Sequence, residues 1–277
     1  MPELPEVETI ANGLHKRVAG DVIESVWIGD KTNLLKSPAA EIAKMLEGAE
    51  IAHARRVGKH IVIDLAEPRR RKDSAHKPRG QWIVHLGMTG RMLVCDADVE
   101  LAKHTHLVAQ LRSGRELRFV DPRRFGKLQV VAAESFRAPG DEPIGADREK
   151  FFKLFKGRKT PIKSALLNQK LLSGIGNIYA DESLFRSAIR PRRRAATLTR
   201  NDLMRLYDAI QVVLAEAIAA GGSSVSDYVD ANGDEGFFQL VHHVYGREDE
   251  PCLVCATPIK RVVIAGRSSH YCPKCQK

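Results

Sequence analysis

The 277 residues are enough for two domains of ordinary size, and a composition of 43% apolar and 28% charged residues indicates a folded chain rather than a disordered one. The 44 Lys and Arg residues exceed the 34 Asp and Glu residues, giving a net charge of +10. This surplus favours a polyanionic partner, most often nucleic acid, although a protein that is merely basic would show it too. The apolar stretches are short, and the opening MPELPEVE lacks the order of a secretory signal, so neither a membrane partner nor export is expected.

The first expected element is a helix over residues 5–18, with Pro5 in its first turn. Short apolar runs broken by turn residues follow from about residue 21 to 133, which is typical of a β-sandwich or barrel, with one helix inserted at 39–46. The segment 67–79 is rich in Lys and Arg, and indicates a solvated loop or, alternatively, a supplementary phosphate contact. The expected strands cover residues 22–28, 60–65, 82–86, 91–94, 107–111, 117–120 and 128–131.

The Pro-, Gly- and Asp-rich segment 137–147 marks the best domain boundary. Helical periodicity follows it, most clearly in a helix that Thr199 can cap and that Gly221 and Gly222 can end. The small, polar stretch 221–236 is expected to be a mobile loop. The expected divisions are an N-terminal domain over 1–136, a linker over 137–149, a helical domain over 150–245 and a terminal ribbon over 246–277.

Four of the five cysteines form two CxxC pairs near the end of the chain, Cys252 with Cys255 and Cys272 with Cys275, separated by 16 residues. Two such pairs suit one tetrahedral zinc ion, and the segment between them reads as a hairpin. The alternative is four unrelated cysteines. Four thiolates leave no open coordination position, so we expect a structural zinc ion that does not activate water. The ribbon alone would equally fit a transcription factor or a ribosomal protein.

Chemistry at the amino terminus is a second expectation. If Met1 is removed, Pro2 becomes a secondary amine with a pKa of about 8, which can attack an aldehyde-like carbon and form an iminium ion. Glu3 beside it could act as a general acid or base. The alternative is that the Met-Pro start does no chemistry and that Glu3, Glu6 and Glu8 simply favour the helix dipole.

Six motifs in order give the chain a resemblance from end to end to bacterial formamidopyrimidine-DNA glycosylase, which is also an abasic-site lyase. They are MPELPEVETI, RRVGKHIVIDL, HLGMTGR, DPRRFGKL, GIGNIYADESLF and the zinc ribbon. The related endonuclease VIII group typically opens with a PEGPE-type sequence, so the ELPEVE version favours the purine-lesion branch. The resemblance implies an α+β fold of two domains, in which a catalytic N-terminal helix and a β-sandwich precede a helix–two-turn–helix domain that ends in the ribbon.

The resemblance also implies roles in catalysis. Pro2 matches the nucleophile that attacks C1′, Glu3 matches the carboxylate that transfers protons, and Glu6 matches a second acidic position that supports the geometry. Lys59 matches a lysine associated with phosphate contact and proton transfer, although without the family it would be an ordinary surface lysine. Arg267 matches the ribbon arginine that contacts phosphates and is linked to the second elimination step.

Excision from a duplex requires the nucleotide to leave the stack, and something must fill the gap. Three side chains match those that the family inserts: Met88, Arg123 and Phe125. Core packing is the alternative for Met88 and Phe125. The remaining matches to DNA-contacting residues are His104, Arg158 and Asn177.

This sequence departs from the family in two places. The segment 67–79 is longer than in many relatives, and Ser226 and Phe237 stand where some relatives have Lys and Tyr, which leaves the reading of the oxidised base open. The resemblance implies an enzyme of the bacterial cytoplasm that acts on damaged double-stranded DNA, with one structural Zn²⁺ and no nucleotide cofactor. A monomer is expected, because a protein that grips and bends one lesion can act alone, although the sequence does not determine the oligomeric state. The alternatives are an enzyme for oxidised pyrimidines, like endonuclease VIII, and a non-catalytic DNA-binding zinc-ribbon protein.

Overall fold

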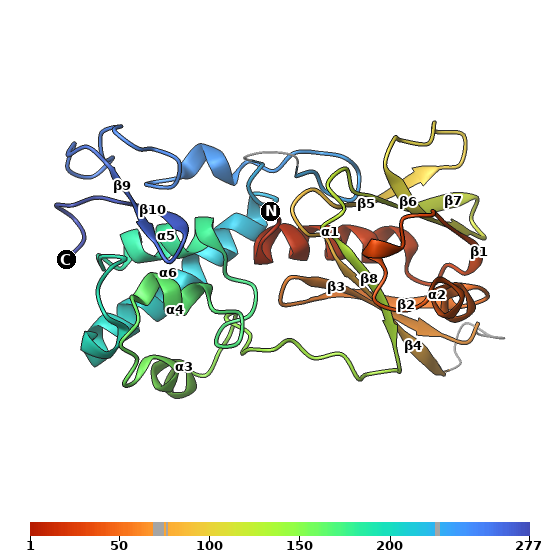
Figure 1. Ribbon diagram of the computed structural model, residues 1–277, viewed down its shortest axis with the longest axis horizontal. Helices are drawn as coiled ribbons and strands as arrows, with labels where there is room; N and C mark the ends of the chain where they lie inside the picture. The colour runs from red at the N-terminus through yellow and green to blue at the C-terminus, as the bar shows by residue number, and fades with distance from the viewer. Residues whose placement is uncertain (69–74, 76, 225–227) are drawn as a thin grey trace. The chain divides into compact units, whose positions relative to one another are not determined.

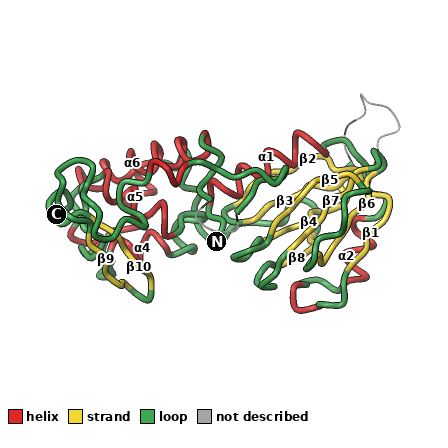
Figure 2. The backbone as a smooth tube through the Cα atoms, turned by 90° about the horizontal axis from the view of Figure 1, so that it is seen from above, coloured by secondary structure: helices red, strands yellow, loops and turns green. Residues whose placement is uncertain are grey.

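The computed structural model describes residues 1–68, 75, 77–224 and 228–277. These residues divide into two compact units, which are Met1–Arg137 together with Gly221–Gly236, and Ala138–Ala220 together with Phe237–Lys277. The strands of the first unit and the helices of the second are apparent in Figure 1 and, by colour, in Figure 2. Residues 221–236 therefore pack with the first unit, although their neighbours in sequence on both sides belong to the second.

The first unit is the expected β-sandwich. One antiparallel sheet has the order β1-β6-β7-β5 and the other the order β2-β3-β4-β8. The bounds are β1 Ile23–Ile28, β2 Glu50–Val57, β3 His60–Ala66, β4 Pro78–His85, β5 Arg91–Asp96, β6 Thr105–Leu111, β7 Arg115–Val120 and β8 Lys127–Val131. Helix α2 (Ala39–Leu46) lies where the sequence predicts it, and a short 3₁₀ turn covers Thr32–Leu34.

Strand β2 was not among the expected strands. Its sequence, EIAHARRV, mixes two alanines with a glutamate, a histidine and two arginines, so it contains no apolar run of the kind that marks the other strands. Its pairing with β3 also shifts between Ile51 and His53.

Helix α1 (Leu4–Val18) packs on β2 and β3 (Figure 1). Its apolar face, with Val7, Ile10 and Leu14, is almost fully buried in the same core as the inward residues of both sheets. Pro5 lies in its first turn, where a missing backbone N–H costs nothing because no helical acceptor precedes it. The helix that carries the expected catalytic residues at its start is thus fixed to the sandwich along its length.

The second unit is mainly helical. Its helices are α3 Arg148–Phe155, α4 Ile162–Leu167, α5 Asn177–Arg186 and α6 Arg200–Ala219, with 3₁₀ turns at Ala195–Thr197 and Phe238–Val241. Thr199 caps α6 by accepting a hydrogen bond from Asp202 N, as the sequence predicts. Turns over residues 168–176 join α4 to α5 and form the helix–two-turn–helix, and strands β9 (Lys260–Ile264) and β10 (Arg267–Tyr271) form the hairpin of the ribbon.

The expectation of a mobile loop over 221–236 is corrected for the part that the structure describes. Ala231 is fully buried, and Tyr228 is buried in the core beside α1 and donates a hydrogen bond from its hydroxyl to Gly221 O at 2.9 Å. Arg17 of α1 binds both Ala231 O and Asn232 Oδ1. Ser226 and most of the basic segment 67–79 lie outside the described residues. Among the described helices, none combines the length and the apolar character that crossing a bilayer requires.

Candidate active site and DNA-contact residues

The start of α1 gathers Pro2, Glu3 and Glu6 in a buried position. Pro2 is buried, and only 4% of Glu3 and 2% of Glu6 are exposed. Glu3 is the N-cap residue, and its backbone N–H donates to Glu6 Oε2 at 2.8 Å. The other oxygen, Glu6 Oε1, accepts a hydrogen bond from Ser223 N at 2.7 Å. Because both oxygens of Glu6 bind backbone N–H groups, this carboxylate ties the residue beside Pro2 to the segment 221–224.

The close approach of Glu6 to the segment 221–224 explains why residue 222 is a glycine. Its φ of +85° is a conformation that favours glycine, and a Cβ atom there would lie 2.9 Å from Glu6 Oε1. Burial and the nearby charge of Glu6 raise the pKa of Tyr228, so this phenol stays protonated and keeps its bond to Gly221 O. The segment after α6 is thereby held against the first turn of α1 by the Glu6 carboxylate, which binds the backbone N–H of Ser223.

Lys59 lies in the turn between β2 and β3, directly after Gly58, whose φ is +60°. The lysine is half-buried. The next residue, His60, has its ring 4.9 Å from that of His85 at the end of β4. Burial lowers the pKa of His85 to about 4, and its unprotonated Nδ1 accepts a hydrogen bond from Gly87 N at 3.1 Å. Neutral His85 thus helps to shape the turn that carries Met88.

Met88 and Phe125 lie on two turns at the ends of strands, and neither packs in the core. The exposed fractions are 39% for Met88 and 51% for Phe125. The Arg123 side chain is also exposed, and its guanidinium carbon lies 5.1 Å from the centre of the Phe125 ring. A hydrophobic side chain on an exposed turn gains little for folding, so the exposure argues against the core-packing alternative for both residues.

His104 is exposed on the connection between β5 and β6. Its φ of +70° is uncommon for a residue other than glycine, and its carbonyl oxygen accepts a hydrogen bond from Asp121 N at 3.0 Å. Asp121 opens the turn that carries Arg123 and Phe125. The structure therefore brings four expected DNA-contact residues of the first unit onto connected turns.

The other expected contacts belong to the second unit. Arg158 is exposed in the turn after α3. Asn177 is the first residue of α5, with Gly176 as its N-cap, so the backbone N–H groups at this helix start are suited to an anion. Arg267 is exposed as the first residue of β10, after a turn in which Ala265 and Gly266 both have positive φ.

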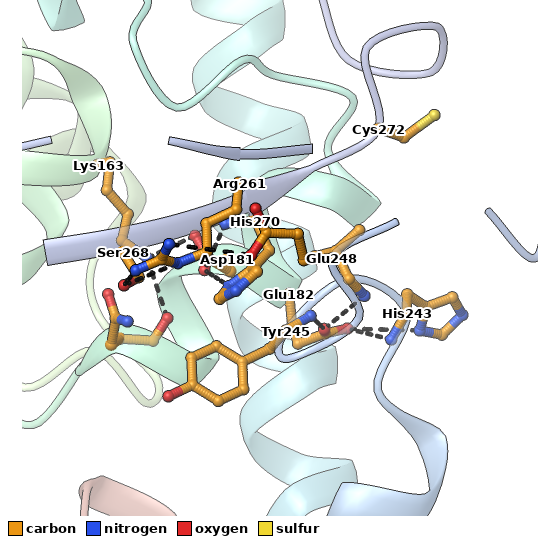
Figure 3. A network of polar contacts seen from close by, with 12 residues as sticks. Lys163, Asp181, Glu182, His243, Tyr245, Glu248, Arg261, Ser268, His270 and Cys272 are labelled. Carbon is orange, nitrogen blue, oxygen red and sulfur yellow. Dashed lines mark hydrogen bonds and ion pairs between the residues drawn. The ribbon is translucent and has the colours of Figure 1, made fainter. Parts of the chain in front are cut away.

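A buried polar network, drawn in Figure 3, connects the ribbon with helices α4 and α5. Lys163 and Asp181 are both fully buried, with Nζ and Oδ1 2.5 Å apart. Lys163 Nζ also donates to Asn177 O at 3.0 Å, and Asp181 Oδ2 accepts from His270 N at 3.0 Å. The start of α5 and strand β10 are therefore held by the same ion pair.

The neighbouring Glu182 anchors the segment that leads into the ribbon. Its Oε1 accepts hydrogen bonds from the backbone of Val244 and Tyr245, and its Oε2 accepts one from His243 N, each at 2.9 Å (Figure 3). Burial opposes ionisation, but the nearby His243 side chain and these three backbone hydrogen bonds lower the pKa of Glu182 below its ordinary value.

The four cysteines of the ribbon converge. The Sγ atoms of Cys252, Cys255, Cys272 and Cys275 all lie within 4.8 Å of one another, with Cys252 to Cys275 at 3.9 Å and Cys255 to Cys272 at 3.5 Å. A tetrahedron with Zn–S bonds of about 2.3 Å has edges of roughly 3.8 Å, so the cluster fits one zinc ion. Hydrogen bonding by Thr257 lowers the pKa of Cys255 to about 6, whereas burial raises the pKa of Cys272. A bound cation is what would let all four thiols ionise together.

Several residues that organise these positions were not identified from the sequence. Asp121 stands inside the DPRRFG motif, where an Asp-Pro pair signals a turn but not a buried carboxylate. Lys163, Asp181 and Glu182 are fully buried charges on short helices. No local sequence pattern marks Tyr228, because its packing depends on a helix more than two hundred residues away in the chain.

The fold and the site together define a class of protein. Its members have a zinc ribbon and an N-terminal helix that begins with buried carboxylates beside a proline. Comparison with known families agrees over nearly the whole chain. Residues 1–128 match the formamidopyrimidine-DNA glycosylase N-terminal domain, residues 139–229 match the H2TH domain of the same family, and residues 249–277 match the zinc finger found in FPG and IleRS.

Relatives of full length are found as well. The formamidopyrimidine-DNA glycosylase of Gluconobacter oxydans is 42% identical, with all of both chains covered. The crystal structure of MutM (Fpg) from Thermus thermophilus is 38% identical, with a TM-score of 0.85 over 99% of this chain and 98% of that one. A Lactococcus lactis Fpg mutant bound to DNA containing Fapy-dG is 31% identical, with a TM-score of 0.88 over the whole of both chains. The chain therefore belongs to the formamidopyrimidine-DNA glycosylase family.

Proposed function

We propose that this protein is a DNA glycosylase of base excision repair that removes oxidised purines, such as formamidopyrimidines and 8-oxoguanine, and then cuts the strand as an abasic-site lyase. Full-length similarity to formamidopyrimidine-DNA glycosylases supports the activity. The observation that carries the mechanism is the joining of Glu3 and Glu6 beside Pro2 at the buried start of α1. The same contacts also form a capping box at the start of α1, so their position beside Pro2 is what favours catalysis.

In the proposed reaction, removal of Met1 exposes the Pro2 nitrogen, which attacks C1′ of the damaged nucleotide. The bond from C1′ to the base breaks, and the base leaves with the bonding electrons and takes up a proton. The nitrogen loses its own proton, and its lone pair then opens the sugar as O4′ is protonated, which leaves an iminium ion at C1′. We assign the transfer of these protons to Glu3, and we propose that Glu6 positions Glu3 by accepting a hydrogen bond from its backbone N–H.

The iminium ion explains strand cleavage. It withdraws electrons and acidifies C2′, so loss of a C2′ proton expels the 3′ phosphate in a β-elimination. Loss of a further proton from C4′ expels the 5′ phosphate in a δ-elimination, and hydrolysis then frees Pro2. We propose that Arg267 assists the second elimination by binding phosphate, since a guanidinium group matches phosphate oxygens, and that Lys59 contributes phosphate contact and proton transfer.

The exposed turns of the first unit suit a duplex from which one nucleotide has been extruded. Met88 and Phe125 can replace the lost stacking, and Arg123 can pair with the edge of the orphaned cytosine. We assign supporting DNA contacts to His104, Arg158 and Asn177, the last through the start of α5. Zinc takes no part in the chemistry, because four cysteines fill its coordination.

Three further proposals concern the setting of the enzyme. We propose that it acts as a monomer in the bacterial cytoplasm, associated with the nucleoid through DNA. The partner is damaged double-stranded DNA, and no nucleotide cofactor takes part. We also propose the functional division into 1–136, a linker at 137–149, 150–245 and the ribbon at 246–277, in which residues 221–236 of the third part pack with the first unit.

Borohydride trapping tests the mechanism. Reduction of the iminium ion makes the link permanent, so mass spectrometry should place 8-oxoguanine DNA on the first peptide of the processed protein. Pro2→Gly should trap less DNA and Glu3→Gln should slow base release, whereas Glu24→Gln, an exposed control paired with Arg112, should change neither. An adduct on Lys59 would refute the role of Pro2. Faster excision of oxidised pyrimidines than of purines would favour the endonuclease VIII-like alternative, and no trapping on either lesion would favour a DNA-binding protein without catalysis.

A further inference from the structure

Asp121 is a fully buried aspartate between the two turns that carry Met88 and Phe125. It follows β7 directly and precedes Pro122. Nothing in the proposed chemistry requires this residue, because it does not belong to the start of α1 or to the ribbon. A buried carboxylate is nevertheless costly unless its oxygens are well bonded, so its contacts indicate what it does.

The two carboxylate oxygens bind different turns. Oδ1 accepts a hydrogen bond from the Thr89 hydroxyl at 2.6 Å, on the residue next to Met88. Oδ2 accepts a hydrogen bond from Gly126 N at 2.8 Å, on the residue next to Phe125. Arg123 N completes the arrangement, 3.3 Å from both Asp121 Oδ1 and Thr89 Oγ1. The Asp121 side chain therefore binds the Thr89 hydroxyl beside Met88, the backbone of Arg123 and the backbone beside Phe125.

The backbone of Asp121 adds a third segment. Its N–H donates to His104 O at 3.0 Å, and its carbonyl oxygen accepts a hydrogen bond from His106 Nε2 at 3.0 Å. His104 has a positive φ, a conformation that a bond from outside its own turn helps to hold.

Two glycines let the turns approach each other closely. A Cβ atom on Gly87 would lie 2.6 Å from the carbonyl carbon of Phe125, and one on Gly126 would lie 3.0 Å from His85 O and 3.1 Å from Asp121 Oδ2. The Met88 turn and the Phe125 turn therefore touch through their backbones, with the carboxylate at the junction.

We propose that Asp121 is a positioning residue that holds these two turns at one fixed spacing, so that Met88, Arg123 and Phe125 enter the DNA as a single preformed unit. The inference rests on the proposed function, since it assumes that these side chains fill the space of an extruded nucleotide. The void left by one nucleotide has a fixed size, so turns that are already set at that spacing lose little conformational entropy on insertion. Without Asp121, the spacing between the two turns would no longer be fixed before the protein binds DNA.

The test uses the full-length protein and two kinds of duplex, one with a stable abasic analogue opposite cytosine and one undamaged. Thr89→Val keeps the side-chain shape but removes the hydroxyl that reaches Asp121, and Thr89→Ser restores it. Thr197→Val is the control for the same substitution elsewhere, because the exposed Thr197 hydroxyl donates only a neutral hydrogen bond, to Arg194 O at 2.8 Å, in the second unit. Asp121→Asn is a second perturbation, since it removes the charge and leaves one acceptor oxygen where the carboxylate has two, so Gly126 N and the Thr89 hydroxyl can no longer both donate to this side chain.

Thr89→Val should weaken binding to the abasic duplex about 10-fold, the effect of losing one charge-assisted hydrogen bond. Binding to the undamaged duplex and its salt dependence should stay unchanged, because phosphate contacts supply that term. Thr89→Ser and Thr197→Val should resemble the wild type. In a Met88→Ala background, Thr89→Val should have little further effect, because it acts through the Met88 turn.

Three results would overturn the inference. They are full abasic-site selectivity in Thr89→Val, an equal loss of affinity for both duplexes, or additive effects of Thr89→Val and Met88→Ala. If Asp121→Asn does not fold, the Thr89 variants still decide. If the wild-type protein excises 8-oxoguanine and Thr89→Val keeps its selectivity for the abasic duplex, only the role of Asp121 is refuted. If the wild-type protein excises nothing, the proposed function is refuted.

Discussion

Replacing Glu182 with Gln should destabilise the second unit more than any surface change of the same kind. Glu182 is fully buried, and its oxygens accept three backbone hydrogen bonds from the segment 243–245. A glutamine can keep its oxygen toward Val244 and Tyr245. Its amide nitrogen, however, then faces His243 N. Because both groups are hydrogen-bond donors, the bond from His243 N is lost.

The size of the effect follows from these contacts. Losing the bond from His243 N to a charged oxygen costs about 2 kcal/mol, and weakening the other two bonds from charge-assisted to neutral costs about 1 kcal/mol more. A loss of about 3 kcal/mol in the free energy of unfolding corresponds to a fall of about 10 °C in the melting temperature of a unit this size. The segment that leads into the ribbon should loosen first.

Differential scanning calorimetry of the zinc-loaded protein measures this change. Glu216→Gln is the matched control, because Glu216 pairs with Arg186 at 2.6 Å on α6 while its side chain remains 49% exposed. An exposed pair of this kind is worth about 0–1 kcal/mol. If Glu182→Gln lowered the melting temperature no more than Glu216→Gln does, the three hydrogen bonds would not be the anchor that we infer.

Three other changes have clear expected outcomes. Cys272→Ser should release zinc and abolish DNA binding before the sandwich unfolds, as metal analysis and a binding assay would show, and full affinity for lesion DNA would exclude the ribbon from the DNA grip. Phe125→Ala should slow excision about 10-fold in single-turnover kinetics with little change in nonspecific binding, and an unaltered rate would remove it from the inserted group. Lowering the pH from 7 to 5 should reduce the free energy of unfolding of the sandwich by about 2 kcal/mol, as urea titrations would measure. The cause is His85, whose pKa is about 4 in the folded protein and about 6.5 in the unfolded chain, so that between these values only the unfolded chain binds the proton. His85→Asn should remove that share of the acid sensitivity, and a variant that loses as much stability as the wild type would refute the assignment.

The sequence allowed the fold class to be predicted because its signals are local. The periodic face of α1, the cap at Thr199 and the paired cysteines each depend on residues close together in the chain, and the structure confirms the helices, the sandwich and the cysteine cluster. Strand β2 was not predicted because its sequence, EIAHARRV, holds four charged or histidine residues and no apolar run.

Packing between distant segments could not be predicted in the same way. The stretch 221–236 has the composition of a loose loop, yet Tyr228 and Ala231 are buried against a helix at the other end of the chain. Similarly, an aspartate before a proline indicates a turn, and only the assembled sandwich shows that Asp121 reaches two turns at once. The roles that we assign to individual site residues still come from the resemblance and remain predictions.

The return of residues 221–236 to the first unit also constrains how the protein is made. The chain leaves this unit after Arg137 and comes back only at Gly221, bringing the residues that cover α1 and bind Glu6. During synthesis, helices α3 to α6 therefore leave the ribosome before residues 221–236 do. Until residue 236 has emerged, one face of the first helix of the nascent sandwich stays uncovered. A fragment that stops at Arg137 should be prone to aggregate for the same reason, whereas supplying residues 138–277 as a separate chain should rescue it.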